Sequence, residues 1–216
     1  MNEMETQFEE IYFKNKWLYG SGEGSLPEHT RGYVSVLQKF LRQHCITTVV
    51  DMGCGDWQFS KLIDWTGIKY DGFDIVSSVI GENQKRFSSN TVKFHLYSGN
   101  PGKLPAADLL IAKDVLQHLS DGAVKAFLRE LKRYKYAIIT NCVNPDSATV
   151  NADIEDGGFR YLDLRLPPFS IEAEELFSFT NQRPIFTRLF SKPRWVKKVL
   201  LVQSRTQRRD SESMRT

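Results

Sequence analysis

A short turn with two glycines is the part of this sequence best suited to hold a ligand. Gly53 and Gly55 follow a run of β-branched and apolar residues that ends in Asp51 and Met52. Glycines in such a turn let a ligand approach the backbone closely. Asp74 stands 21 residues after Gly53, about where nucleotide-binding sheets place the acid that grips a ribose diol. This spacing predicts a binding site for a ribose-containing ligand.

The same turn argues against a phosphate-rich ligand. The dinucleotide fingerprint needs a third small residue where this chain has Gln58, and the chain has no Gly-Lys-Ser or Gly-Lys-Thr phosphate loop. A ligand with a ribose and no phosphate therefore fits better than a dinucleotide or a nucleoside triphosphate. A nicotinamide-dependent dehydrogenase is disfavoured for the same reason.

Strands that alternate with helices must position this turn. Helices separate most of five strand-like runs, at residues 47–52, 70–76, 92–96, 108–112 and 136–140. One helix is expected to begin at Pro27, with Ser25 as its cap and Glu28 completing a capping box, and another to be capped by Ser120. The alternation indicates crossover units and a parallel sheet with helices on both faces.

The pattern changes after residue 141. We expect a strand-like stretch at residues 159–164 and a short helix at residues 171–179. Residues 185–190 and 196–202 are both strand-like and only a short segment around Pro193 separates them, which favours an antiparallel hairpin over another crossover.

Three segments resemble the motifs of class I S-adenosylmethionine-dependent methyltransferases. Residues 49–55 resemble the first motif of that family, residues 72–75 the second, and residues 108–119 the motif at the fourth strand. The final hairpin matches the reversed last strand of the family's sheet. The resemblance spans residues 46–203 and implies a Rossmann-like three-layer α/β sandwich, with a mostly parallel seven-stranded sheet and a reversed last strand. It implies a methyltransferase core at residues 46–204. From the residues themselves we expect an N-terminal helical cap or lid at residues 1–45 and, because apolar periodicity is lacking, a basic, unstructured tail at residues 205–216.

The resemblance also implies S-adenosylmethionine as the cofactor. In the family's pattern Asp51 holds the amino group of the cofactor's methionine part and Asp74 accepts from its ribose hydroxyls. The residues that would contact the cofactor are Asp51, Gly53, Cys54, Gly55, Asp74, Ile75, Ser98, Lys113 and Asp114. Two departures from the pattern stand out: Trp57 occupies the place of a third glycine, which predicts a bulkier wall at the methionine end, and residues 97–100 lack the acid that holds the adenine amine.

Candidate catalytic residues follow the fourth strand. His118 is the best candidate base because the reference pKa of histidine lies near neutrality. It stands four residues after Asp114, so one helical turn would place both on the same face. The alternative is a histidine at a helix start that is bonded only to backbone.

Two segments are candidates for binding the methyl acceptor. Residues 17–25 combine aromatics, glycines and serines, which favours a lid over the site, with Trp17, Ser21, Gly22 and Ser25 as candidate contacts. The alternative is a plain loop with Trp17 packed on the core. Arg31, one turn into the next helix, is a further candidate, and so is Arg160 in the acid-rich segment 153–164.

Composition and charge limit the classes of partner that can be expected. The formal net charge is +3, yet residues 183–209 carry nine Lys or Arg and no acid, so this segment is either a handle for an anionic partner such as nucleic acid or a solvated strand pair. Three widely spaced cysteines make neither a disulfide framework nor a zinc cluster, which predicts a reduced, cytoplasmic setting without a metal. No apolar run approaches the roughly 20 residues that cross a bilayer, and no membrane partner is expected.

The leading hypothesis is methyl transfer from S-adenosylmethionine to an oxygen or nitrogen of a small molecule. Two alternatives remain open: a methyltransferase of RNA or protein that docks through the basic C-terminal hairpin, and a cofactor-binding protein without catalysis. No Asn/Asp-Pro-Pro-Tyr/Phe motif follows the fourth strand, which argues against enzymes that methylate the amino groups of DNA bases or glutamine. The sequence leaves the oligomeric state undetermined.

Overall fold

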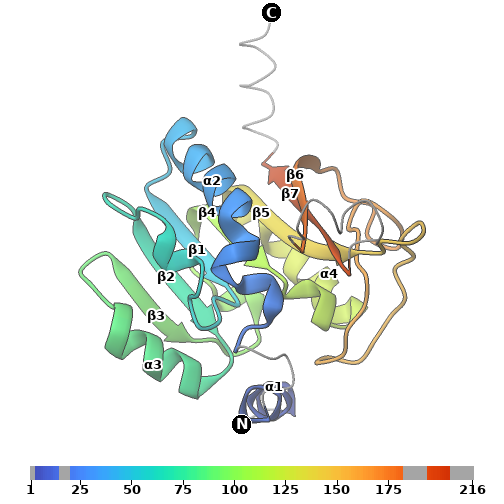
Figure 1. The fold of residues 1–216 in the computed structure, drawn as a ribbon, viewed down its shortest axis with the longest axis horizontal. Helices are drawn as coiled ribbons and strands as arrows, with labels where there is room; N and C mark the ends of the chain where they lie inside the picture. Colours follow the sequence, from blue (N-terminus) through green and yellow to red (C-terminus); the bar gives the residue numbers. More distant parts are fainter. Residues whose placement is uncertain (1–2, 15–19, 182–193, 205–216) are drawn as a thin grey trace, which may run out of the picture.

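The computed structural model of the chain describes residues 3–14, 20–181 and 194–204 and contains one seven-stranded sheet (Figure 1). The strand order is β3-β2-β1-β4-β5-β7-β6. The strands are β1 (Thr48–Met52), β2 (Lys69–Asp74), β3 (Val92–Leu96), β4 (Ala107–Lys113), β5 (Tyr134–Val143), β6 (Glu174–Thr180) and β7 (Val196–Gln203). Strands β1 to β5 pair in parallel, whereas β7 is antiparallel to both β5 and β6. The predicted fold class, with its reversed last strand, is therefore confirmed.

Helices cover both faces of the sheet because successive residues of a strand point to opposite sides. In β1, Val49 packs in a cluster with α2 (Pro27–Gln43) and α3 (Ser77–Phe87), while Val50 packs in a second cluster with α4 (Asp121–Glu130). Strand β4 repeats the pattern, since Leu109 belongs to the first cluster and Leu110 to the second. The result is a three-layer sandwich in which the carboxyl ends of the parallel strands meet at one edge.

A further helix, α1 (Glu3–Phe13), packs near that edge and close to α3 (Figure 1). Phe8 and Ile11 of α1 form a small buried cluster with Ile75 and Val76, which directly follow β2. Short 3-10 turns complete the described chain: η1 (Glu23–Ser25), η2 (Ser60–Leu62), η3 (Pro101–Lys103), η4 (Leu116–His118) and η5 (Leu131–Arg133). None of the helices in the described ranges is long and apolar enough to cross a membrane.

The C-terminal part of the sheet differs from the sequence prediction. Residues 171–179 were expected to be helical, but most of them form β6, and residues 159–164 form no strand. Phe177 and Phe179 lie two residues apart on one face of β6 and pack against the α2 side of the core, so tertiary packing overrides the helix-favouring Glu and Ala residues. The partner of β7 in the antiparallel pair is β6, and the expected strand at residues 185–190 lies outside the described residues.

The two expected helix caps have different outcomes. Ser120 caps α4 as predicted, with its hydroxyl accepting from the backbone N–H of Ala123. Ser25 does not cap α2: the cap position is Leu26, which makes no side-chain capping bond, and Ser25 instead ends η1 with its side chain buried. The prediction of a capping box is therefore wrong. Ser25 instead lines the cavity described next.

Candidate functional site

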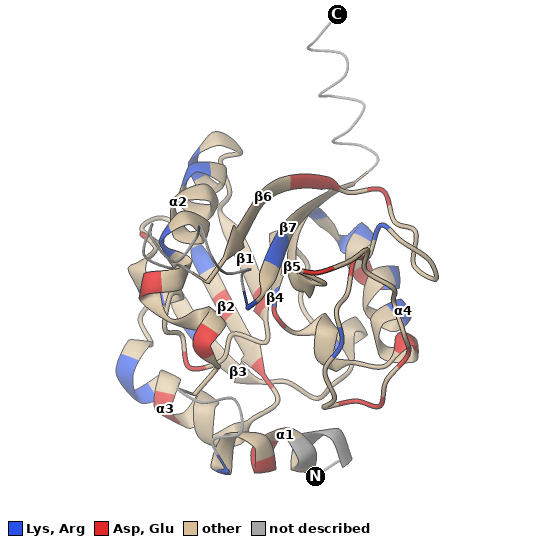
Figure 2. Cartoon of the chain, turned by 45° about the vertical axis from the view of Figure 1, so that its right-hand side comes forward, with Lys and Arg blue, Asp and Glu red and all other residues tan. Residues whose placement is uncertain are grey.

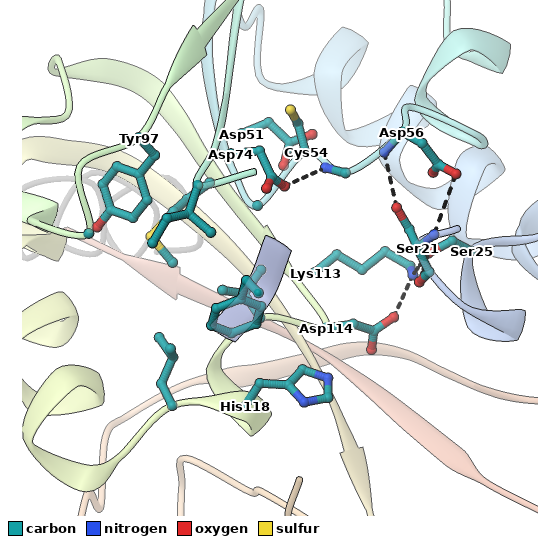
Figure 3. A pocket seen from close by; sticks show the side chains of 18 of the residues that line it. Ser21, Ser25, Asp51, Cys54, Asp56, Asp74, Tyr97, Lys113, Asp114 and His118 are labelled. Carbon is teal, nitrogen blue, oxygen red and sulfur yellow. Dashed lines mark hydrogen bonds and ion pairs between the residues drawn. The ribbon is translucent and has the colours of Figure 1, made fainter. Parts of the chain in front are cut away.

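A cavity opens at the carboxyl ends of β1, β2 and β4 (Figure 3). It encloses about 1100 Å³ of empty space, its open mouth included. Its wall combines the glycine turn after β1, the end of β2, the end of β4 and the segment from η4 into α4. Phe8 and Tyr12 of α1, together with Ser21 and Ser25, line it from the N-terminal side.

The glycine turn is tied to β2 by backbone bonds. Gly53 and Cys54 both donate to the carbonyl of Phe73, at 2.7 and 3.1 Å, and Gly55 donates to Oδ2 of Asp74 at 2.9 Å. Both glycines have positive φ, 74° for Gly53 and 54° for Gly55. A Cβ on Gly53 would come within 2.2 Å of the Val115 side chain, and one on Gly55 within 2.2 Å of the Ser21 hydroxyl. Only glycine fits at these two places, so backbone forms the wall of the cavity.

The two acids beside the turn are buried. Asp74 accepts from the N–H groups of Gly55 and Val76, and burial raises its pKa although these bonds oppose the rise. Asp51 accepts a hydrogen bond of 2.7 Å from the Tyr70 hydroxyl, and burial raises its pKa to about 7. Ile75, beside Asp74, also lines the cavity and is buried under α1.

Trp57 does not narrow the cavity. It adopts the positive φ of 57° that the turn requires, but its ring packs in the core against Tyr70, Phe87 and Phe94. The prediction that Trp57 forms a bulkier wall at the methionine end of the cofactor is therefore wrong. Cys54 lines the cavity instead, and burial raises the pKa of its thiol.

Three charged side chains meet at the end of β4. Asp114, with φ of 61°, directly follows the strand, and its Oδ2 accepts from the ammonium groups of Lys113, at 2.6 Å, and of Lys197 on β7. Burial alone would raise the pKa of Asp114, but the two ammonium groups outweigh it and lower the pKa to about 2. Lys113 donates also to the carbonyl of Gly24 at 3.1 Å, which ties the N-terminal segment to the sheet.

His118 lines the cavity next to this cluster. It lies in the 3-10 turn η4, so it does not stand one α-helical turn from Asp114 as the sequence predicted. The N–H of Cys142 donates to Oε1 of Gln117, which turns the Gln117 amide nitrogen toward Nε2 of His118 at 3.3 Å. Nδ1 of His118 then carries the proton and donates to the carbonyl of Gly158 at 2.7 Å. Burial lowers the pKa of His118, so the imidazole is neutral near pH 7.

The N-terminal segment closes over the glycine turn. The Ser21 hydroxyl bonds to the Tyr12 hydroxyl at 2.8 Å. It also accepts from the N–H of Asp56 at 3.0 Å (Figure 3). Ser21 and Ser25 thus line the cavity, and the lid role expected of their segment stays a prediction. Gly22, half-buried with φ of 89°, lies between them without lining the cavity, and Trp17 lies outside the described residues.

Arg31, Ser98 and Arg160, which were predicted as site residues, do not line the cavity either. Arg31 is exposed on the outer face of α2, in a shallow groove with Arg42 and Leu62. Ser98 is exposed after β3, and its neighbours Tyr97 and Gly99 line the cavity in its place.

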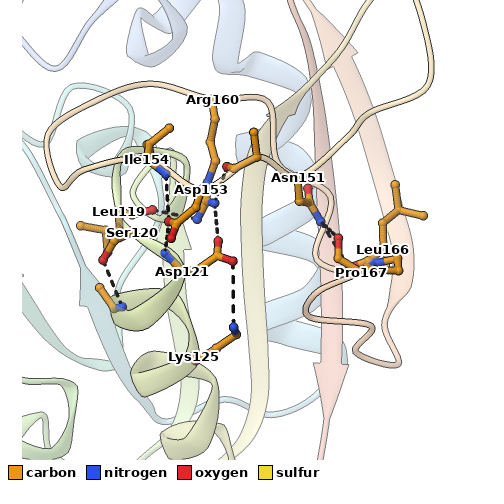
Figure 4. Close-up of polar contacts among 12 residues, drawn as sticks. Leu119, Ser120, Asp121, Lys125, Asn151, Asp153, Ile154, Arg160, Leu166 and Pro167 are labelled. Carbon is orange, nitrogen blue, oxygen red and sulfur yellow. Dashed lines mark hydrogen bonds and ion pairs between the residues drawn. The ribbon is translucent and has the colours of Figure 1, made fainter.

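Arg160 is buried and contacts the start of α4 and the loop that precedes Arg160 (Figure 4). Its guanidinium donates to Oδ1 of Asp121 at the start of α4 and to the carbonyls of Leu119 and Ala152. These bonds hold the loop of residues 152–160 against α4, a structural task rather than contact with an acceptor. Lys197 was not predicted from the sequence, because no local pattern marks one lysine of a strand as buried.

The described part of the chain holds no group of three or more His, Cys, Asp or Glu side chains that could bind a metal ion. No protein-family model matches the sequence. A search of curated proteins also gives no match.

Solved structures do resemble the chain. Magnesium protoporphyrin IX methyltransferase from Synechocystis PCC 6803 with bound S-adenosylmethionine superposes with a TM-score of 0.60 at 17% identity, over 94% of this chain and 98% of that one. TehB from Haemophilus influenzae gives 0.57 at 15% identity, over 91% and 67%. Human N-acetylserotonin methyltransferase gives 0.53 at 16% identity, over 79% and 51%. Because the identities are this low, the superpositions establish the fold alone. It is the fold of class I S-adenosylmethionine-dependent methyltransferases.

Proposed function

We propose that this protein transfers a methyl group from S-adenosylmethionine to an oxygen or nitrogen of a small-molecule acceptor. The observation that carries the proposal is the meeting of the glycine turn and Asp74 on the wall of a large cavity, at the carboxyl edge of a sheet with methyltransferase topology. Ligands of open α/β sheets bind at this edge.

The residues present fit such a cofactor. The two glycines leave a backbone cradle that a Cβ would fill, and Asp51 and Asp74 offer carboxylates to an amino group and to ribose hydroxyls. Within the described chain, Oδ1 of Asp56 and Oδ1 of Asp114 are buried at the cavity without a hydrogen-bond partner. Buried acceptors are rarely left unpaired in proteins, so a donor-bearing ligand is expected beside them.

When bound, S-adenosylmethionine supplies a methyl group that its sulfonium makes electrophilic. The chain then needs mainly to hold a nucleophile in line at roughly 3 Å, which can contribute about 7–11 kcal/mol. Asp114 suits this positioning task, because it is ionised and its Oδ1 can accept from a hydroxyl or amine. His118 is neutral, so it is the better residue to take a proton from that nucleophile, at Nε2 in place of the bond from the Gln117 amide.

A small acceptor is favoured over RNA or protein because the cavity is partly roofed. Tyr12, Ser21 and Ser25 line it from the N-terminal side, and Lys113 fixes Gly24 close by. A macromolecular acceptor docking through the basic residues 183–209 remains the second hypothesis. Under it, replacing Arg205, Arg208 and Arg209 would weaken binding and reduce its salt dependence.

The decisive experiment is calorimetric titration with S-adenosylmethionine and its demethylated product, with NAD as the negative control. We expect both sulfur compounds to bind and NAD not to bind. Asp74→Ala should weaken binding at least about tenfold, since a hydrogen bond to a charged group contributes about 1.5–3 kcal/mol. Asp71→Asn is the matched control, because Asp71 is a β2 acid that pairs with Lys69 and His95 instead. If folded wild-type protein binds neither compound, the proposal is wrong.

A further inference from the structure

The two lysines that share Asp114 differ in how many of their N–H donors have a partner. Lys113 donates to Oδ2 of Asp114, to the carbonyl of Gly24 and, at 3.5 Å, to the Ser25 hydroxyl, so its three donors are used. Lys197, on β7, has a single hydrogen-bonded partner among the described residues, which is the same Oδ2 of Asp114. Two of its three donors are left over.

Lys197 is nevertheless buried, with 6% of its side chain exposed. Its close neighbours include the Trp195 ring, 5.0 Å from its ammonium, and Gly24, where an added Cβ would come within 2.1 Å of Nζ. Neither neighbour carries negative charge. A buried ammonium with unused donors is costly unless an anion completes its shell.

The charges around Lys197 do not balance. When both ammonium groups are protonated, Lys113 and Lys197 carry two positive charges against the single negative charge of Asp114; burial lowers the pKa of Lys113 because this excess positive charge is costly there. Figure 2 shows basic residues on β7 within the sheet, and Figure 3 shows Asp51 and Asp74 grouped away from Asp114 beside the glycine turn. Those two acids would face the cofactor, which itself brings a sulfonium to the site. The acceptor side therefore stays positive.

We propose that the methyl acceptor is a small anion whose carboxylate or phosphate group binds to Lys197 from the side of the cavity that Asp114 lines. This inference rests on the proposed function and names its substrate class. The anion neutralises the excess charge and takes the two unused donors of Lys197. Oδ1 of Asp114 is buried without a hydrogen-bond partner among the described residues. It can accept a hydrogen bond from a hydroxyl of the same anion. Burial lowers the pKa of His118, the Gly158 carbonyl and Asp114 oppose this shift, and Lys197 adds a smaller lowering, so His118 lies within electrostatic reach of Lys197.

The test is calorimetric titration of the full chain, with and without the demethylated cofactor, at constant ionic strength. The probes are benzoate, its neutral analogue benzamide, and inorganic phosphate. We expect saturable binding of benzoate or phosphate and none of benzamide, and the preferred anion identifies the acidic group of the acceptor. Lys197→Met, which keeps the length of the side chain, should weaken this binding at least tenfold.

Lys198→Met is the matched control. Lys198 is the next residue of β7, but its ammonium pairs with Asp163 and Glu175, so anion binding should be unchanged. The inference is overturned if neither anion binds saturably, if benzamide binds as well as benzoate, or if Lys197→Met binds anions like the wild type. Because the anion titrations without cofactor are independent of cofactor binding, a failure here is distinguishable from a failure of S-adenosylmethionine to bind.

Discussion

Tyr70 on β2 donates its hydroxyl hydrogen to Oδ2 of Asp51 on β1, at 2.7 Å, within the buried core beneath the cavity. Asp51 is 2% exposed and Tyr70 is fully buried. The bond favours the ionised carboxylate, yet burial disfavours it more strongly, so the pKa of Asp51 is raised to about 7. The site thus holds an acid that changes its charge near neutrality, where a cationic ligand group would favour the ionised form.

Asp51→Asn should stabilise the ligand-free protein at alkaline pH. The folded pKa of Asp51 is raised above its ordinary value, so the stability that it contributes is fully present below about pH 4 and is lost as pH rises through about 7. The asparagine variant does not lose this stability, because asparagine does not titrate. In urea unfolding, its free energy of unfolding relative to wild type should rise by about 1–3 kcal/mol between pH 5 and pH 8.

The same variant should bind S-adenosylmethionine more weakly. Tyr70→Phe serves as a companion, because removing the hydroxyl raises the pKa of Asp51 further and moves the midpoint of the stability loss to higher pH. A difference between Asp51→Asn and wild type that does not change with pH would contradict the assignment.

Comparing Gly55→Ala with Gly67→Ala separates the effect of backbone strain on stability from the effect of cavity shape on ligand binding. Both glycines have positive φ, 54° and 75°, so either alanine should cost about 1–2 kcal/mol in unfolding free energy. A Cβ at Gly67 meets nothing within 4 Å, whereas one at Gly55 would strike the Ser21 hydroxyl, which bonds to Tyr12 and Asp56.

We therefore expect calorimetry to show unchanged binding of S-adenosylmethionine for Gly67→Ala and a loss of at least about tenfold for Gly55→Ala. A Gly55→Ala variant that binds as wild type does would show that the turn and the Ser21 segment do not form the ligand cradle.

The parts of the fold that follow local patterns were predictable from the sequence. The first four strands lie within two residues of their predicted bounds, and the Gly53–Gly55 turn and Asp74 meet at one edge because parallel strands end together. Arg31 could have been excluded on the same grounds: it lies off the helix face of α2 that carries the buried residues Tyr33 and Leu37.

The parts that depend on pairing distant strands were not predictable. Strand β6 begins with helix-favouring residues, yet it pairs with β7 and packs Phe177 and Phe179 against the α2 side of the core. Lys197 reaches Asp114 because β7 inserts between β5 and β6, opposite Cys142 and Phe179. Arg160 looked like a site residue in an acid-rich loop, and only the docking of that loop on α4 shows where its guanidinium lies.

Arg160→Met should destabilise the protein strongly without weakening the binding of S-adenosylmethionine. Its side chain is 4% exposed, and removing it leaves Asp121 and two backbone carbonyls without their donor. Breaking such a buried pair costs about 3–5 kcal/mol. Lys125→Met is the matched control, because Lys125 pairs with the same Asp121 at 4.0 Å from a half-exposed position and should cost no more than about 1 kcal/mol. Equal melting temperatures for the two variants would refute the structural role of Arg160.

His118→Asn should make the protein less sensitive to acid. Burial lowers the pKa of His118 below its ordinary 6.5, so the stability that the neutral imidazole contributes is present above pH 6.5 and is lost as pH falls through the folded pKa. Asparagine cannot take up that proton, but its amide can still donate to the carbonyl of Gly158 in place of Nδ1.

Chemical unfolding between pH 7.5 and pH 5 measures this effect. The wild type should lose up to about 1.4 kcal/mol per pH unit more than the variant below pH 6.5. His44, whose pKa burial also lowers, is present in both proteins and cancels in the comparison. Parallel curves would mean that the pKa of His118 is the same in the folded and unfolded protein, which would contradict the lowering of that pKa by burial.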